Sequence, residues 1–253
     1  MTSHRAQILD QFTQQAVPFS TAPGIKNEAA LRLLVDTSGA GGEDTVLDVA
    51  CGPGLVVAAF AASVRHVTGI DVTPAMIARA GELTAGASNV SLDIGDVQAL
   101  PYADGTFSIV VSRFAFHHFQ RPGVVLAEMR RVCRLHGRVV VCDLLASDDP
   151  KKAAAFHAME MMRDPSHARA LRLDELYALF AEAGLRADAP VYYRLPIELE
   201  GLLLRSFPAP DHMPLIRRAY EDSLADDGLG LATKRVDGTI HGAYQVAIVT
   251  ARR

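Results

Sequence analysis

An aspartate and two glycines stand where an apolar segment gives way to a turn. Residues 46–54 read VLDVACGPG, which places Asp48 inside an expected strand and Gly52 and Gly54 in the turn after it. Glycine lets a backbone approach a ligand closely, and the helix expected from residue 55 directs unpaired N–H groups and the positive end of its dipole there. A carboxylate inside an apolar strand is costly without a partner, which a cationic ligand group would supply. The segment therefore predicts a binding turn of the nucleotide type.

Two more aspartates follow the next expected strands. Asp71 comes directly after residues 66–70, and Asp96 follows the strand expected at 89–94. Thr73 and Pro74 suffice to start the next helix, so Asp71 is not needed as its cap and suits a ribose diol. Asp96 can accept a hydrogen bond from an adenine amino group, or serve only as a turn residue. We expect these carboxylates at one rim of the sheet, where the carboxyl ends of parallel strands meet.

The elements that would position these residues alternate along the chain. From residue 45 onward, short β-branched segments alternate with helical patterns, which predicts a doubly wound α/β sheet with helices on both faces. Strands are expected at 45–49, 66–70, 89–94, 106–112, 138–143, 185–195 and 243–251. Helices are expected at 55–63, 74–84, 122–135 with Gly137 as its stop, 150–163, 173–183, 198–206 and 212–225.

Asp48, Gly52, Gly54, Asp71 and Asp96 together resemble the S-adenosylmethionine site of class I methyltransferases. Residues 95–102 (GDVQALPY), 107–112 (FSIVVS) and 117–119 (HHF) are similar to the ubiquinone/menaquinone-biosynthesis methyltransferase-like (type 11) group. The resemblance covers residues 45–143. Ser108 stands where that group commonly has Asp, and Leu135-His136-Gly137 replaces its usual Lys-Pro-Gly-Gly, which loosens the subgroup more than the fold.

The resemblance implies a cofactor, a fold and a set of contacts. The cofactor is S-adenosyl-L-methionine, and the fold is a Rossmann-like, seven-stranded, mostly parallel sheet with one antiparallel C-terminal strand. The glycine turn lies under the methionine moiety, the acid after the second strand binds the ribose, and the Gly-Asp pair flanks adenine. The implied cofactor-binding residues are Asp48, Ala50, Gly52, Gly54, Asp71, Val72, Met76, Asp96, Val97 and Arg113.

Residues after the fourth and fifth strands are candidates for catalysis. His117 and His118 titrate in the range useful to a general base, and in an extended chain only one of them would face the pocket. Both could equally cap or pack the turn before Pro122. No third ligand follows at metal-binding spacing, so we expect no metal. Other side chains that could serve the substrate are Asp143, Phe19, His157 and Tyr193. Met159, Met161 and Met162 could line an apolar pocket, but methionines at such positions more often fill gaps in the core.

Composition limits the remaining possibilities. The 25 Lys and Arg against 29 Asp and Glu give a formal net charge of −4, which makes nucleic acid a poor default partner. Three cysteines without metal or disulfide spacing fit a reducing, cytoplasmic location. We expect no export signal and no membrane partner, because the most apolar stretch, residues 55–62, is far shorter than the roughly 20 residues that cross a bilayer.

The chain is treated as one domain over 1–253. It comprises an N-terminal helical cover (1–43), a cofactor-binding core (44–145), and substrate-side helices with the last strands (146–253). A helical insertion at 197–225, between the last two strands, is a candidate lid. A homodimer is possible, and no sequence feature decides the oligomeric state.

The leading hypothesis is methyl transfer from S-adenosylmethionine to a small phenolic, quinone-like or heteroaromatic molecule. Methylation of RNA or protein and cofactor binding without transfer stay open. An NAD(P)-dependent oxidoreductase is disfavoured because Val57 stands at the third glycine position of the dinucleotide fingerprint. Neither the acceptor nor its methylated atom can be read from the sequence.

Overall fold

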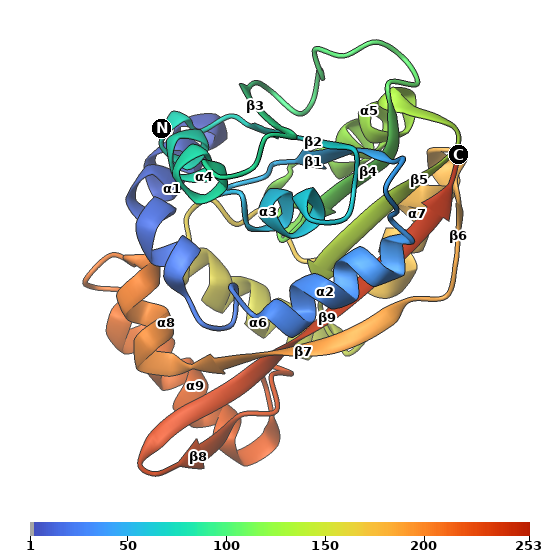
Figure 1. Ribbon diagram of the computed structural model, residues 1–253. Coiled ribbons are helices and arrows are strands. Elements are labelled where there is room, and N and C mark those ends of the chain that lie inside the picture. Colours follow the sequence, from blue (N-terminus) through green and yellow to red (C-terminus); the bar gives the residue numbers. More distant parts are fainter. Residues whose placement is uncertain (1–2) are drawn as a thin grey trace.

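A mixed sheet with the strand order β3-β2-β1-β4-β5-β9-β6 organises residues 3–253, the part of the chain that the computed structural model describes (Figure 1). Five strands are parallel: β1 (Thr45–Val49), β2 (His66–Asp71), β3 (Val90–Ile94), β4 (Phe107–Arg113) and β5 (Cys133–Leu144). The long β9 (Thr239–Arg252) runs antiparallel to β5. The doubly wound, mostly parallel sheet with an antiparallel C-terminal strand is confirmed.

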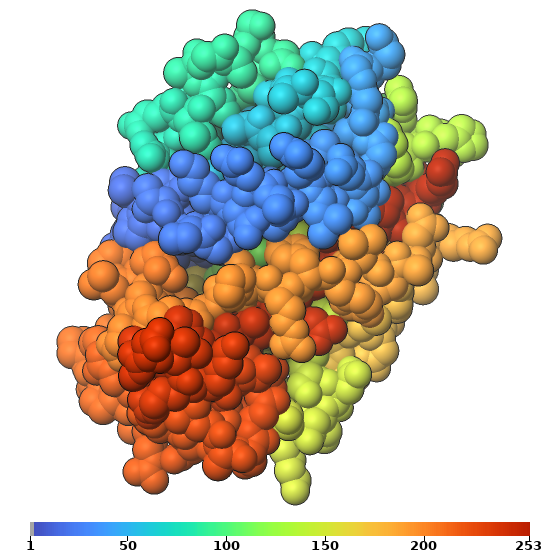
Figure 2. All heavy atoms as spheres, turned by 60° about the horizontal axis from the view of Figure 1, so that its bottom comes forward, coloured from blue at the N-terminus to red at the C-terminus, as the bar shows by residue number. Residues whose placement is uncertain are grey.

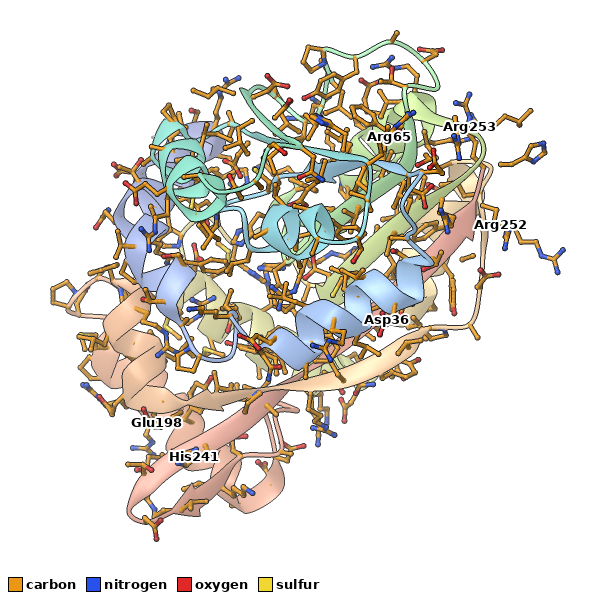
Figure 3. All side chains as sticks on the ribbon, viewed as in Figure 1. Asp36, Arg65, Glu198, His241, Arg252 and Arg253 are labelled. Carbon is orange, nitrogen blue, oxygen red and sulfur yellow. The ribbon has the colours of Figure 1, made fainter. Side chains whose placement is uncertain are left out.

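The far edge of the sheet is more divided than the sequence indicates. The strand expected at 185–195 is split into β6 (Arg186–Ala187) and β7 (Val191–Glu198), which pair with successive parts of β9. A short β8 (Lys234–Val236) forms a hairpin with the start of β9, so the sheet has nine strands. Figure 3 shows how far β9 extends: His241 lies beside its register partner Glu198, and Arg252 lies near the opposite end.

Helices cover both faces of the sheet and bury two separate apolar clusters. One cluster includes residues of α2 (Glu28–Ser38), α3 (Leu55–Ala61), α6 (Pro150–Arg163), α8 (Leu199–Ser206) and α9 (Met213–Asp226). The other includes residues of α5 (Pro122–Val132) and α7 (Leu173–Glu182). The two clusters lie on opposite faces of the sheet. Strands that are covered on both faces need apolar residues on both.

The N-terminal helix connects two helices that are far apart in the sequence. α1 (His4–Thr21) packs against both α4 (Pro74–Thr84) and α8. Arg79 donates from Nε to Ser20 Oγ at 3.0 Å, and Gln11 donates from Nε2 to the Ser206 carbonyl at 2.6 Å. Figure 2 shows the N-terminal segment lying between the sphere groups of residues near 80 and near 200. Among residues 3–253, no helix combines the length and apolar character needed to cross a bilayer.

The junction of α5 and β5 corrects one expectation. A helix was expected to reach residue 135 and to stop at Gly137, but α5 ends at Val132 and β5 begins at Cys133. Gly137 lies inside that strand, where a Cβ atom would stand 2.6 Å from Cys133 Sγ and 2.8 Å from the Ser108 carbonyl oxygen. The glycine is therefore required by the close approach of β4 to the bulged start of β5, and not by a helix end.

Replacement of Gly54 by alanine is expected to lower the free energy of unfolding by about 2–3 kcal/mol. Gly54 has φ +84° before α3, and an added Cβ would stand 2.7 Å from Ala80 Cβ on α4. Urea denaturation measures the loss. Gly86→Ala is the matched control, since no heavy atom lies within 4 Å of its Cβ position. Equal stability of the two variants would contradict the close packing of α3 on α4.

Candidate active site

A cavity of about 360 Å³ opens at the carboxyl ends of β1, β2 and β4, beneath α1. Its volume lies within the range of about 300–1,000 Å³ typical of small-molecule sites. The turn after β1, the end of β2, the loop after β3 and the end of β4 each contribute to its wall. The fifth contributor is α1, with Ser3 before it, through His4, Arg5, Ile8, Phe12 and Phe19. We call this the first cavity.

Asp71 joins the two turns that border the first cavity. Its Oδ2 accepts from the Gly52 N–H at 2.9 Å, and its Oδ1 accepts from the Thr73 N–H at 2.8 Å. Burial raises the pKa of Asp71, although these hydrogen bonds favour its charged form. As expected, Thr73 is the N-cap of α4 and Pro74 is its first residue; the Thr73 side chain makes no capping hydrogen bond, and Asp71 holds the amide of this N-cap residue.

Some residues of the turn after β1 border the first cavity, and others only support the turn. Ala50 and Gly52 line the first cavity, and both have positive φ, 58° and 52°. The only atom near a Cβ built on Gly52 is Met76 Sδ at 4.0 Å, so the turn presents open backbone. Gly54 does not line the cavity and instead brings α3 against α4.

Asp48 lies behind the turn and does not line the first cavity. Its side chain is buried, and Oδ2 has no hydrogen-bond partner within residues 3–253. Burial first and the charge of Asp71 second raise the pKa of Asp48 to about 8, while the charge of Arg113 opposes the shift. The expected direct contact between Asp48 and a cationic ligand group is therefore not supported by the geometry.

Asp96 lies on the opposite wall and is partly covered by α1. Arg5 Nη1 is 3.2 Å from Asp96 Oδ2, and Asp96 Oδ1 accepts from the Gln98 amide at 2.9 Å. Asp96 therefore also acts as a turn residue, the alternative role that the sequence left open for it. Eight of the ten implied cofactor residues surround this one cavity: Ala50, Gly52, Asp71, Val72, Met76, Asp96, Val97 and Arg113.

Arg113 lines the first cavity and holds two enclosed hydrogen-bond donors without partners at its wall. Its Nη1 donates to the Ile25 carbonyl at 3.1 Å, and its guanidinium lies 4.2 Å from the centre of the Phe114 ring. Neither Nε nor Nη2 has a partner among the described residues, although both are buried. Unpaired buried donors are costly, so a ligand with an anionic group would stabilise this side chain.

His117 and His118 lie in a short 3₁₀ helix, η1 (Phe116–His118), so the expectation of an extended chain there is wrong. Their ring centres are 4.1 Å apart, and both face a second cavity of about 100 Å³. His117 Nδ1 is 2.6 Å from Asp143 Oδ1, and His118 Nδ1 is 3.0 Å from the Ser166 carbonyl oxygen. The structure therefore brings Asp143 to the site, as a partner of His117.

The second cavity adjoins the first. His118, Phe12, Phe19 and Phe114 line both. Of the candidate lid, residues from the end of β7 and from α8 line the second cavity, and α9 does not. The remaining substrate candidates fall elsewhere: Met159 and Tyr193 pack into or against the core, Met162 packs beside it, and His157 and Met161 line an open third cavity.

Several residues at these cavities carry no signal in the sequence. Asp164, Ser166 and His167 lie behind the histidine pair, and Arg163 is held between Glu160 and Ser206. They lie at the end of α6 or just after it without any recognisable spacing, and only the fold brings them near η1. Among residues 3–253, no group of three or more His, Cys, Asp or Glu side chains is arranged to hold a metal ion.

Comparison with known proteins places the chain in a family. A methyltransferase-domain family matches residues 47–141. An uncharacterized methyltransferase from Bacillus subtilis, YcgJ, is 31% identical over 177 residues, covering 69% of this chain and 70% of that protein. A 2-methyl-6-phytyl-1,4-hydroquinone methyltransferase from Synechocystis is 35% identical over 120 residues, 47% of this chain and 38% of that protein.

The solved structures agree. The crystal structure of YcgJ superposes with a TM-score of 0.83 at 26% identity, covering 89% of this chain and 98% of the other. A putative methyltransferase from Bacillus halodurans gives a TM-score of 0.82 at 25% identity, with 88% and 98% covered. The expectation drawn from the glycine turn and the three carboxylates is confirmed: this chain belongs to the methyltransferase-domain family of class I S-adenosylmethionine-dependent methyltransferases.

Proposed function

We propose that this enzyme methylates a small molecule, which it binds in the second cavity. The observation that carries the proposal is the size and position of that cavity: it measures about 100 Å³ and shares four lining residues with the first. A space of this size suits a small molecule, whereas an RNA or protein substrate could place only a single base or side chain in it. The similarity to a relative named for a hydroquinone substrate also supports a small acceptor.

The first cavity fits the cofactor by the chemistry of its walls. When bound, S-adenosylmethionine supplies a methyl group on a positively charged sulfur for in-line displacement. We assign the ribose hydroxyls to Asp71, the adenine side to Asp96 and Val97, and the space beside the glycine turn to the methionine portion, bordered by Ala50, Gly52, Val72 and Met76. Asp48 and Gly54 support the turn from below.

The cofactor's carboxylate is assigned to Arg113. Two unpartnered guanidinium nitrogens, buried at the wall of the cavity, suit a carboxylate better than any other group of the cofactor. Catalysis then rests on placement, since holding two reactants in contact can contribute about 7–11 kcal/mol. His117 and His118 are the candidates for removing a proton from the acceptor.

Arg113→Met is expected to weaken binding of S-adenosylhomocysteine by about 10- to 30-fold, equivalent to about 1.5–2 kcal/mol for a lost charge-assisted hydrogen bond. Calorimetric titration measures the change. Arg65→Met, at an exposed residue just before β2 (Figure 3), is the matched control and is expected to bind as the wild type does. Unchanged affinity in Arg113→Met would remove Arg113 from the cofactor site.

The proposed function is tested by the destination of a labelled methyl group. A bacterial extract is split by ultrafiltration into small-molecule and macromolecular fractions, and each is incubated with the enzyme and methyl-labelled cofactor. We expect label in the small-molecule fraction. Label only in RNA or protein, or cofactor binding with no transfer into either fraction, would contradict the proposal.

A further inference from the structure

The second cavity has an apolar body and one polar corner. Its apolar wall comes from α1, β7 and α8 and from the residues that follow β4 and end β5, and its polar corner holds His117, His118 and Asp164. A cavity of about 150 Å³ with apolar walls takes up one benzene ring. The second cavity, at about 100 Å³, therefore leaves room for a single ring at most.

The Arg163 guanidinium beside this corner already has its partners. Arg163 donates from Nε and Nη2 to Glu160 Oε2 at 2.9 and 2.5 Å, and from Nη1 to Ser206 Oγ at 2.8 Å. Arg205 also borders the cavity and makes no salt bridge within the described chain, although Glu198 lies on the preceding turn. An anionic acceptor would find carboxylates nearby and no free donor from Arg163, so an uncharged acceptor fits.

Hydrogen bonds fix the ring of His117. Asp143 Oδ1 accepts a hydrogen bond from the protonated Nδ1 of His117 at 2.6 Å. Asp143 Oδ2 lies 3.3 Å from the His117 amide nitrogen. The ring is thus held with its lone pair on Nε2. That atom has no hydrogen-bond partner in the described chain and is not fully enclosed, and His117 lines the second cavity.

The two histidines are not equivalent. Burial lowers the pKa of His117, but the charge and hydrogen bond of Asp143 outweigh this and raise it above the ordinary value. Burial and the neighbouring His117 lower the pKa of His118 to about 4. Glu160 and Asp164 also favour the protonated form of His117, while His118 and His167 are its close ring neighbours. A proton released in this corner is therefore held by His117.

We propose that the second cavity binds an uncharged single-ring molecule with an acidic O–H or N–H, and that His117, oriented by Asp143, removes this proton during methyl transfer. The proposal rests on the proposed function. As the acceptor's O–H or N–H bond breaks, its proton moves to His117 Nε2, and the oxygen or nitrogen forms a bond to the methyl carbon. The bond between that carbon and sulfur breaks, and its electron pair stays on sulfur, which becomes neutral. The His117 proton then passes to water.

The first test is a binding measurement that needs no turnover. The probe is 4-nitrophenol, added to the enzyme saturated with S-adenosylhomocysteine at one pH unit below the phenol's own pKa. We expect the absorbance of the bound phenol to shift to that of the phenolate, with the proton on His117. His117→Gln and Asp143→Asn are expected to bind it in the neutral form. His136→Asn, an exposed histidine at the start of β5, is the control and should behave as the wild type.

The second test is transfer to a panel of single-ring phenols and azoles, with their carboxylated analogues. We expect methylation of uncharged members only, and a loss of about 10²-fold in kcat in His117→Gln, within the usual contribution of a general base. Affinity for S-adenosylhomocysteine should be unchanged, which also shows that the variants fold. In Asp143→Asn the alkaline rise of activity should move to lower pH, because the group that raises the pKa of His117 is lost.

The outcomes of these two tests separate this inference from the proposed function. Transfer only to carboxylated or larger acceptors, a neutral bound phenol in the wild type, or full kcat in both variants would overturn the proposal while leaving the methyltransferase function intact. A wild-type enzyme that does not bind S-adenosylhomocysteine would overturn the proposed function and this inference together.

Discussion

Asp71→Asn is expected to weaken binding of S-adenosylhomocysteine by about 10³-fold, or about 4 kcal/mol. Both oxygens of Asp71 already accept backbone hydrogen bonds, from Gly52 and Thr73, and these two turns form the floor of the first cavity. An asparagine amide must direct its NH₂ group at one of these N–H donors, which breaks a charge-assisted hydrogen bond and displaces a turn. The contact that we assign to the ribose hydroxyls is weakened in the same step.

Calorimetric titration of wild type and variant measures this effect. Asp36→Asn is the matched control, since Asp36 is exposed on α2, as Figure 3 shows, and has no part in either cavity. We expect its affinity to equal that of the wild type. A change of less than threefold in Asp71→Asn would show that the cofactor does not depend on the end of β2.

Asp48→Asn is expected to stabilise the ligand-free enzyme increasingly as the pH rises. The folded protein holds the pKa of Asp48 near 8, against 3.8 for an ordinary aspartate. Between pH 5 and pH 8, the folded chain therefore keeps a proton that the unfolded chain has released. This lowers the wild-type free energy of unfolding by about 1.4 kcal/mol per pH unit, or about 4 kcal/mol in all. Asparagine is uncharged and removes this dependence.

Urea denaturation at pH 5 and pH 8 checks this second prediction. The quantity of interest is the difference in unfolding free energy between Asp48→Asn and wild type, because titrating groups distant from Asp48 contribute equally to both. We expect that difference to increase by about 4 kcal/mol from pH 5 to pH 8. The Asp36→Asn variant should show no such increase. Curves that stay parallel for Asp48→Asn and wild type would mean that Asp48 is solvated or paired.

The parts of the site that follow from the sequence are those fixed by local chemistry and strand order. Gly52, Asp71 and Asp96 each follow a strand of one parallel sheet, and the carboxyl ends of such strands meet at one edge. Pro74 begins α4 and the helix ends at Thr84, as the pattern predicts. The sequence also predicts the position of Asp48 inside the first strand. It does not predict how far Asp48 lies from the cavity, because that depends on how the turn after the strand folds over it.

Long-range contacts account for what the sequence does not show. The pairing of His117 with Asp143 joins residues 26 positions apart, and the contact of His4 with the His118 carbonyl joins residues 114 apart. Neither has a local pattern that signals it. The contribution of α1 to both cavities is likewise a matter of packing, because its sequence indicates a helix but not the surface on which it lies.

The central claim is that the first cavity holds the cofactor and directs its methyl group toward the second. A crystal structure of the enzyme with S-adenosylhomocysteine tests it most directly. We expect ribose hydroxyls on Asp71, adenine beside Asp96 and Val97, the carboxylate on Arg113, and the sulfur facing the side where His118 joins the two cavities. A ligand bound in another cavity, or in this one with its sulfur turned away from His118, would contradict it.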